Sequence, residues 1–114
     1  MDDDTTILKL KKQVTEFRDA RDWLRYDTPR SLAISISVEA AELLEHFQWK
    51  TDEQMRGVLM DRATKDQISN ELADVLIYCI GFSDVLGIDI SEAVKLKLLK
   101  TGERYPIAGP KLSA

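Results

Sequence analysis

Two pairs of acidic residues, each spaced for one turn of a helix, constrain the fold of this chain more than any other feature. The pairs are Glu39-Ala40-Ala41-Glu42 and Glu71-Leu72-Ala73-Asp74. Spacing of i, i+3 places both side chains of a pair on the same side of a helix. Because each pair adjoins apolar residues, two helices that pack through these faces would gather four carboxylates between them. Such a cluster repels itself unless a cation binds, and Mg²⁺ prefers oxygen ligands, so the pattern predicts a metal site.

Apolar spacing along the whole chain predicts an all-α fold with four long helices and one short helix. Thr28, followed by Pro29, is expected to cap one helix, and Gly87 is expected to end another. Asp89 and Glu92 have the spacing of a capping box at the start of the last helix. The expected helices cover about residues 6–26, 29–50, a short stretch that begins at 51–53, 66–86 and 89–102.

One segment is ambiguous, because its apolar residues alternate with small ones in a strand-like period of two. The alternating residues are Leu32, Ile34, Ile36 and Val38. The segment continues without a break into residues 39–45, which are strong helix formers, and no other segment offers a partner strand. We therefore predict a helix here.

The chain is expected to form one domain over residues 1–114, with an extended tail at 105–114. We expect the helices to make a four-helix-bundle-like protomer. A chain of this size buries only about two thirds of the surface that its unfolded form exposes. Association of copies through helix faces would therefore help its stability, and we expect a homo-oligomer.

Charge and composition narrow the classes of function. The net charge of −4 argues against a nucleic-acid binder, which would carry a basic face. The single cysteine, Cys79, excludes an internal disulfide and lies in an apolar run. No apolar stretch reaches about 18 residues, and the N-terminus is acidic, so we expect neither a membrane span nor a secretory signal. A cytoplasmic location is the expectation.

Other chemistries fit the residues less well than a carboxylate-held Mg²⁺, for which Mn²⁺ is an alternative ion. A di-iron carboxylate bundle needs two Glu-x-x-His motifs, whereas this chain has one histidine, His46. The serines and Cys79 lack a convincing set of base and acid partners for nucleophilic catalysis. A glycine-rich phosphate loop is missing as well. Water activation by Mg²⁺ for attack on a phosphate matches the residues best.

Aromatic residues give a second indication. Trp23 follows the Arg21-Asp22 pair near the end of the first helix, and Trp49 lies near the end of the second. An indole in such a place can stack on a nucleobase. Packing within the protein or at a subunit interface is an equally good explanation of both residues.

Taken together, these motifs resemble the all-α nucleoside triphosphate pyrophosphohydrolases called MazG-like, especially the deoxycytidine triphosphatase branch. The similarity extends from about Phe17 to Pro106, and the order and spacing of its motifs make it specific. The motifs are Arg21-Asp22-Trp23, Thr28-Pro29-Arg30-Ser31-Leu32, Glu39-x-x-Glu42, Phe47-Gln48-Trp49-Lys50, Glu71-x-x-Asp74-x-x-x-Tyr78, Lys97 and Arg104-Tyr105-Pro106.

The resemblance implies a dimer or dimer of dimers with active sites at the interface. It also implies hydrolysis between the α and β phosphates of a nucleoside triphosphate, which releases monophosphate and pyrophosphate. The residues that match catalytic metal ligands of the family are Glu39, Glu42, Glu71 and Asp74. Those that match substrate-binding positions are Trp23 and Trp49 near the base, and Tyr78, Lys97 and Arg104 along the sugar or phosphates.

Two positions depart from the family pattern. Val14 stands where the deoxycytidine triphosphatase branch often has a histidine, so the choice of base stays open. Thr101 replaces an asparagine on the phosphate side, and a hydroxyl offers fewer hydrogen-bonding groups than an amide. A nucleotide sensor without turnover and a helical interaction protein are the alternatives to an enzyme that cleanses the nucleotide pool.

Overall fold

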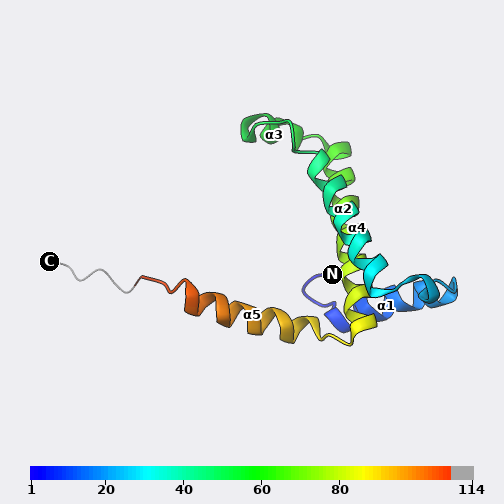
Figure 1. Ribbon diagram of the computed structural model, residues 1–114. Coiled ribbons are helices and arrows are strands. Elements are labelled where there is room, and N and C mark those ends of the chain that lie inside the picture. The colour runs from blue at the N-terminus through cyan, green and yellow to red at the C-terminus, as the bar shows by residue number, and fades with distance from the viewer. Residues whose placement is uncertain (109–114) are drawn as a thin grey trace.

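A computed structural model describes residues 1–108, and helices are the only regular structure in that range (Figure 1). The all-α prediction is therefore confirmed. The elements are α1 (Ile7–Ala20), the 3-10 helix η1 (Leu24–Tyr26), α2 (Pro29–Glu45), α3 (Asp52–Val58), α4 (Arg62–Leu86) and α5 (Ile90–Arg104). Residues 105–108 follow α5 without helical structure, and the rest of the expected tail, 109–114, lies outside the described residues.

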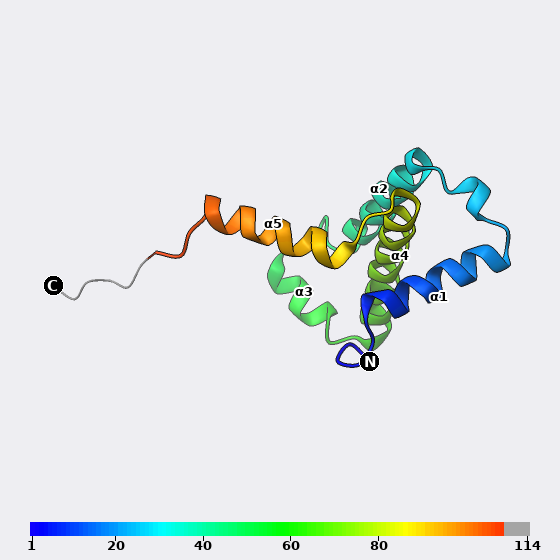
Figure 2. The same ribbon diagram turned by 90° about the horizontal axis from the view of Figure 1, so that it is seen from below.

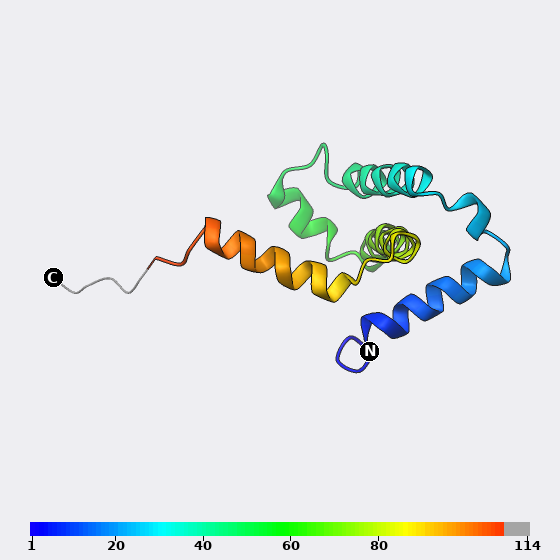
Figure 3. The same cartoon turned by 60° about the horizontal axis from the view of Figure 1, so that its bottom comes forward.

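Helices α2 and α4 form an antiparallel hairpin, and α3 lies at its tip (Figures 1 and 2). Helix α1 packs against α4 near the opposite end of the hairpin. In the view along the hairpin, α2 and α1 lie on different sides of α4 (Figure 3). This arrangement brings the two acidic pairs, one on α2 and one on α4, into the same interhelical space.

Helix α5 projects away from the other helices in all three views (Figures 1, 2 and 3). The radius of gyration is 18.5 Å, whereas a compact domain of this length has about 13 Å. One chain therefore does not close the four-helix-bundle-like protomer that the sequence pattern predicted. Three of the long helices pack together, whereas α5 approaches α1 only through its first residues, where Ile90 and Ser91 line a small pocket with Ile7 and Leu8.

The apolar core of one chain is small. Only three apolar side chains are buried among the described residues, namely Leu32, Met55 and Ile80. Large apolar residues on α5, such as Leu98 and Leu99, are about two thirds exposed. Even so, none of the described helices combines the length and apolarity that crossing a membrane requires. Much apolar surface thus remains uncovered in a single chain.

A side-chain N-cap precedes each α-helix, and the caps of α2 and α5 are Thr28 and Asp89, as the sequence predicted. The Oγ1 of Thr28 accepts a hydrogen bond from Ser31 N at 3.1 Å, and Asp89 Oδ1 accepts one from Glu92 N at 2.8 Å. A reciprocal capping box forms at α3 instead, where Thr51 and Gln54 bond to each other's backbone N–H. Gly87 ends α4 in the left-handed conformation with φ 66°, as expected.

Three helix boundaries differ from the prediction by four residues or more. The second helix ends at Glu45, five residues before its predicted end at 50. The first helix ends at Ala20 instead of Tyr26, because Asp22 adopts a left-handed φ of 56° and turns the chain. Helix α4 begins at Arg62, four residues before the predicted start, because Asp61 accepts a hydrogen bond from Thr64 N and caps the helix there. The ambiguous segment with alternating apolar residues is helical, as predicted.

Candidate metal and nucleotide site

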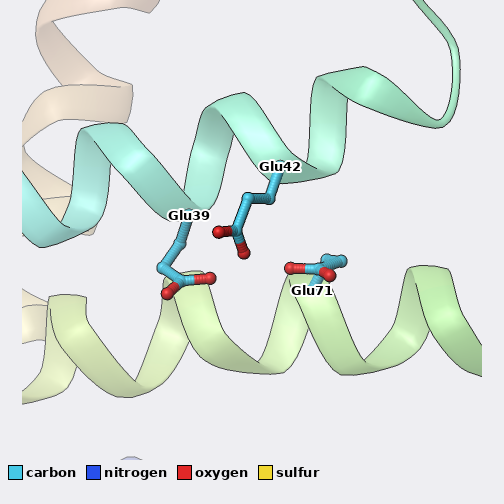
Figure 4. A group of neighbouring side chains, drawn as sticks. All are labelled: Glu39, Glu42 and Glu71. Atoms are coloured by element: carbon cyan, nitrogen blue, oxygen red, sulfur yellow. The ribbon is translucent and has the colours of Figure 1, made fainter.

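Three acidic side chains meet between α2 and α4. Glu39 and Glu42 extend from α2 toward Glu71 of α4, as Figure 4 shows. One carboxylate oxygen from each residue lies within 4.8 Å of the other two. All three residues are half-buried. The helical hairpin therefore assembles a site in which one ion can contact three carboxylates.

Asp74, the fourth predicted ligand, lies one turn beyond Glu71 on α4 and outside this group of three. Its negative charge still contributes to raising the pKa of both Glu39 and Glu71. Asp74 also lines a cavity next to the acids. The structure thus places the fourth acid beside the cluster, between the three glutamates and the cavity.

The electrostatics of the cluster favour a bound cation. Hydrogen bonding with Glu42, followed by burial and the charges of Glu42, Asp74 and Glu71, raises the pKa of Glu39 from 4.5 to about 6. Burial is the largest cause of the raised pKa of Glu71. The Oε2 atoms of Glu39 and Glu71 are buried without a hydrogen-bond partner. Buried oxygens of this kind are costly unless an ion or another donor satisfies them.

The donor set fits Mg²⁺. All the cluster atoms are carboxylate oxygens, which hard divalent ions prefer to nitrogen or sulfur. Glu39, Glu42 and Glu71 would hold the ion, and Asp74 is placed to contribute from the side of the cavity. His46 lies close enough for its charge to lower the pKa of Glu71, but it is not part of the group.

A cavity of about 520 Å³ lies between α1, η1, α2 and α4. Its volume is in the range that small-molecule ligands occupy. Most of its wall is apolar or aromatic, from Val14, Phe17, Trp23, Leu32, Ile77 and Gly81. Its polar wall consists of Arg18, Tyr26, Asp27, Asp74 and Tyr78. The cavity thus adjoins the acids through Asp74 and contains two residues predicted to bind substrate, Trp23 and Tyr78.

Two aromatic rings form one wall of this cavity. Phe17 and Trp23 pack edge to face, with ring centroids 5.9 Å apart and an interplanar angle of 66°. The guanidinium carbon of Arg21 lies 3.4 Å from the centroid of the Phe17 ring. This stack holds the indole in a defined position next to the cavity, where it can contact a flat ligand.

The other predicted substrate-binding residues lie elsewhere in the chain. Trp49 is 85% exposed in the connection between α2 and α3. Lys97 and Arg104 lie on α5, where both are exposed. These three residues do not line the cavity within one chain. Their role in binding stays a prediction.

The cavity contains charged residues that the sequence reasoning missed. Arg18 and Asp27 both line it, yet neither was singled out from the sequence. The signal for Arg18 was its position on the apolar face of the first helix, one turn after Val14 and next to Phe17. Asp27 precedes the cap Thr28, and its sequence position alone gives no indication of the cavity.

Known proteins that are similar to this chain identify its family. A model of the MazG-like family matches residues 34–112. The dCTP pyrophosphatase 1 proteins of Bos taurus and Homo sapiens are 31% and 33% identical to the chain over 102 and 101 residues, which are 90% and 89% of it. The chain spans 60% and 59% of the length of these two relatives.

A solved structure extends the comparison to the fold. A pyrophosphatase from Archaeoglobus fulgidus DSM 4304 superposes with a TM-score of 0.81 and has 47% sequence identity. The match covers 87% of this chain and 91% of that one. The family match, the identities and the shared fold together show that this chain belongs to the MazG-like family.

Proposed function

We propose that this protein is a Mg²⁺-dependent hydrolase of deoxynucleoside triphosphates that releases monophosphate and pyrophosphate and so cleanses the nucleotide pool. The observation that carries the proposal is the contact between two features. The acid cluster contains buried carboxylate oxygens that have no hydrogen-bond partner. Through Asp74 it adjoins a cavity with an aromatic wall. A nucleotide has the matching parts, namely a flat base and a phosphate chain that binds metal. The relatives named dCTP pyrophosphatase 1 favour dCTP as a good substrate.

Glu39, Glu42 and Glu71 hold the ion in this proposal, and Asp74 completes the set. Mg²⁺, when bound, supplies positive charge that neutralises phosphate oxygens and lowers the pKa of water. The protein contributes a fixed arrangement of carboxylates on two packed helices, so little reorganisation is needed when the substrate arrives. Mn²⁺, which also accepts carboxylate oxygens, is expected to substitute.

The order of the groups along the nucleotide decides which bond is broken. In this proposal Trp23 and Tyr78, which line the cavity, contact the nucleoside, and Asp74 marks the side of the cavity that adjoins the acids. The α-phosphate is the phosphate nearest to the nucleoside, so it lies closest to the acid cluster. Hydrolysis between the α and β phosphates therefore fits this geometry better than removal of the terminal phosphate.

Oligomerisation would cover apolar surface that a single chain leaves exposed. The exposed apolar residues of α5 and the small core favour a homodimer or a dimer of dimers. We propose that such an assembly brings Lys97 and Arg104 of α5 to the phosphates and covers the exposed Trp49. The charged pair would then neutralise phosphate oxygens that the metal does not contact.

A screen of the common dNTPs and NTPs for pyrophosphate release, with Mg²⁺ and with EDTA, tests the proposal. The expected result is turnover that requires the metal, with deoxynucleotides preferred and dCTP among the best substrates. Thermal stabilisation by a nucleotide without any turnover would indicate a sensor instead. Neither stabilisation nor turnover with any nucleotide would leave a helical interaction protein as the explanation.

A further inference from the structure

Two charged residues of the cavity have no part in the metal site: Arg18 of α1 and Asp27 in the connection between η1 and α2. We propose that this pair recognises the edge of the base. The cavity then selects a base with both a carbonyl oxygen and an exocyclic amino group, which means cytosine or guanine. The inference rests on the proposed nucleotide binding and adds the residues that choose the base.

Arg18 is a hydrogen-bond donor held at the wall of the cavity. Its side chain is only 9% exposed. Its Nε donates to Asp19 Oδ1 at 2.9 Å, and its Nη1 donates to Asp84 Oδ2 at 2.8 Å. A guanidinium has five N–H donors in a rigid fork, so these two bonds leave three donors unused. The carboxylates on both sides fix the fork, and the remaining donors can bind a carbonyl oxygen of a ligand.

Asp27 is a hydrogen-bond acceptor at the wall of the same cavity. It is half-buried, and its carboxylate makes no hydrogen bond or ion pair with any of residues 1–108. An ionised carboxylate only accepts hydrogen bonds, so the ligand group that it binds must be a donor. An exocyclic amino group is such a donor.

The backbone around Asp27 is held in place by local hydrogen bonds. The N–H of Asp27 donates to the carbonyl of Leu24 at 3.0 Å. The hydroxyl of Ser31 donates to the carbonyl of Tyr26 at 2.8 Å, and Thr28 caps α2 immediately after Asp27. The carboxylate is therefore presented from a fixed turn, as base recognition requires.

The four bases differ in how they match this donor and acceptor. Cytosine and guanine each offer a carbonyl oxygen to Arg18 and an amino group to Asp27. Uracil and thymine have a carbonyl oxygen where cytosine has its amino group, so an acceptor would face the carboxylate. Adenine has the amino group but no carbonyl oxygen for Arg18. A site built around such hydrogen bonds rejects ligands that leave its buried groups unpaired.

Binding of the deoxynucleoside monophosphates tests the pair without any need for turnover. Isothermal titration calorimetry with dCMP, dGMP, dUMP and dAMP should show at least about tenfold tighter binding of dCMP or dGMP than of the other two. Asp27→Asn introduces an amide N–H₂ donor that can bond to the uracil carbonyl. The ratio of the dUMP and dCMP dissociation constants should fall by about tenfold in this variant.

Asp22→Asn is the matched control, because it makes the same change on a side chain that is 77% exposed and does not line the cavity. It should leave the ratio unchanged. Arg18→Lys keeps the positive charge but loses the fork, so it should weaken binding of the preferred monophosphate by about tenfold. Its unfolding temperature should be measured alongside, so that loss of folding is not mistaken for loss of binding.

An unchanged ratio of the dUMP and dCMP dissociation constants in Asp27→Asn would overturn the inference. Wild-type protein that binds all four monophosphates with equal affinity, or that binds none of them, would overturn it as well. Base-blind binding together with full pyrophosphate release would contradict this inference and leave the proposed function standing. Selective binding without pyrophosphate release would contradict the proposed hydrolysis and leave the base recognition standing.

Discussion

Arg18 of α1 donates a hydrogen bond from Nη1 to Oδ2 of Asp84 on α4 across 2.8 Å, and this ion pair joins the two helices beside the cavity. The side chain of Arg18 is 9% exposed, and that of Asp84 is 35% exposed. The other carboxylate on Arg18, Asp19, belongs to the same helix as Arg18. Asp84 is therefore the partner that ties the guanidinium to α4, and a buried charge that loses such a partner is destabilising.

Asp84→Asn should lower the free energy of unfolding by about 1.5 kcal/mol, because it weakens a charged hydrogen bond to a buried group. Asp22→Asn is the control. It removes one charge from an exposed ion pair with Arg25, in which the side chains are 77% and 65% exposed, and should cost less than about 0.5 kcal/mol. Urea denaturation measures both. Equal effects would show that the Arg18–Asp84 pair is no stronger than a surface ion pair.

Neutralising the acids should remove activity without loss of stability. Glu39→Gln, Glu42→Gln, Glu71→Gln and Asp74→Asn should each reduce turnover at saturating Mg²⁺ by at least about 100-fold, since outer-shell changes at metal sites alone cost 10–100-fold. The metal-free variants should unfold at the same or a higher temperature than wild type, because a mutual repulsion has been relieved. Glu45→Gln, on an exposed residue of α2, is the control. Near wild-type turnover in all four variants would refute the metal site.

The raised pKa of Glu39 predicts how the stability of the metal-free protein depends on pH. Well below pH 4.5 the group is protonated in both states and has no effect. As the pH rises from 4.5 to about 6, the unfolded chain releases this proton first, so the free energy of unfolding falls. Well above about pH 6 the penalty is complete, and the raised pKa of Glu71 acts in the same direction.

Denaturation of EDTA-treated protein at pH values below 4.5 and above about 6 measures this effect. Glu39→Gln should be more stable than wild type at the higher pH and equal to it at the lower pH. Mg²⁺ should restore the stability of wild type at the higher pH, because an ion that binds only the folded state stabilises it. If wild type and Glu39→Gln differ in stability by the same amount at both pH values, the raised pKa of Glu39 is not the cause of the difference.

Much of the fold follows from local sequence signals. The caps at Thr28 and Asp89 and the left-handed Gly87 were predictable, because each depends on residues next to it in the chain. The break after Ala20 was not, because Asp22 takes its left-handed φ within a segment whose residues continue the helical apolar spacing. The projection of α5 was not predictable either, since apolar spacing shows which face must be covered but not by which chain.

The candidate site likewise has one part that the sequence predicts and one part that it does not. The i, i+3 pairs on α2 and α4 were sufficient to predict that Glu39, Glu42 and Glu71 meet, because each helix fixes its own pair and the hairpin aligns them. The place of Arg18 and Asp27 in the cavity depends on how α1 and η1 lie on α4, which is a tertiary feature. Helical spacing carries no information about the angle at which α1 crosses α4.

Assembly is expected to cover the exposed apolar residues of α5. Light scattering should report a mass at least twice the 13.0 kDa of one chain. Leu98→Glu places a charge on a side chain that is 66% exposed in one chain, so it should shift the mass toward a monomer and reduce turnover. Lys95→Glu on the same helix is the control for added negative charge. A fully active monomer of the wild-type protein would contradict the proposed assembly.

We propose that the acid cluster and the adjoining cavity direct hydrolysis to the bond between the α and β phosphates. Phosphorus NMR of the products formed from dCTP and Mg²⁺ identifies the bond that is broken. We expect dCMP and pyrophosphate in equal amounts, with no reaction when EDTA is present. Formation of dCDP and inorganic phosphate would refute cleavage between the α and β phosphates.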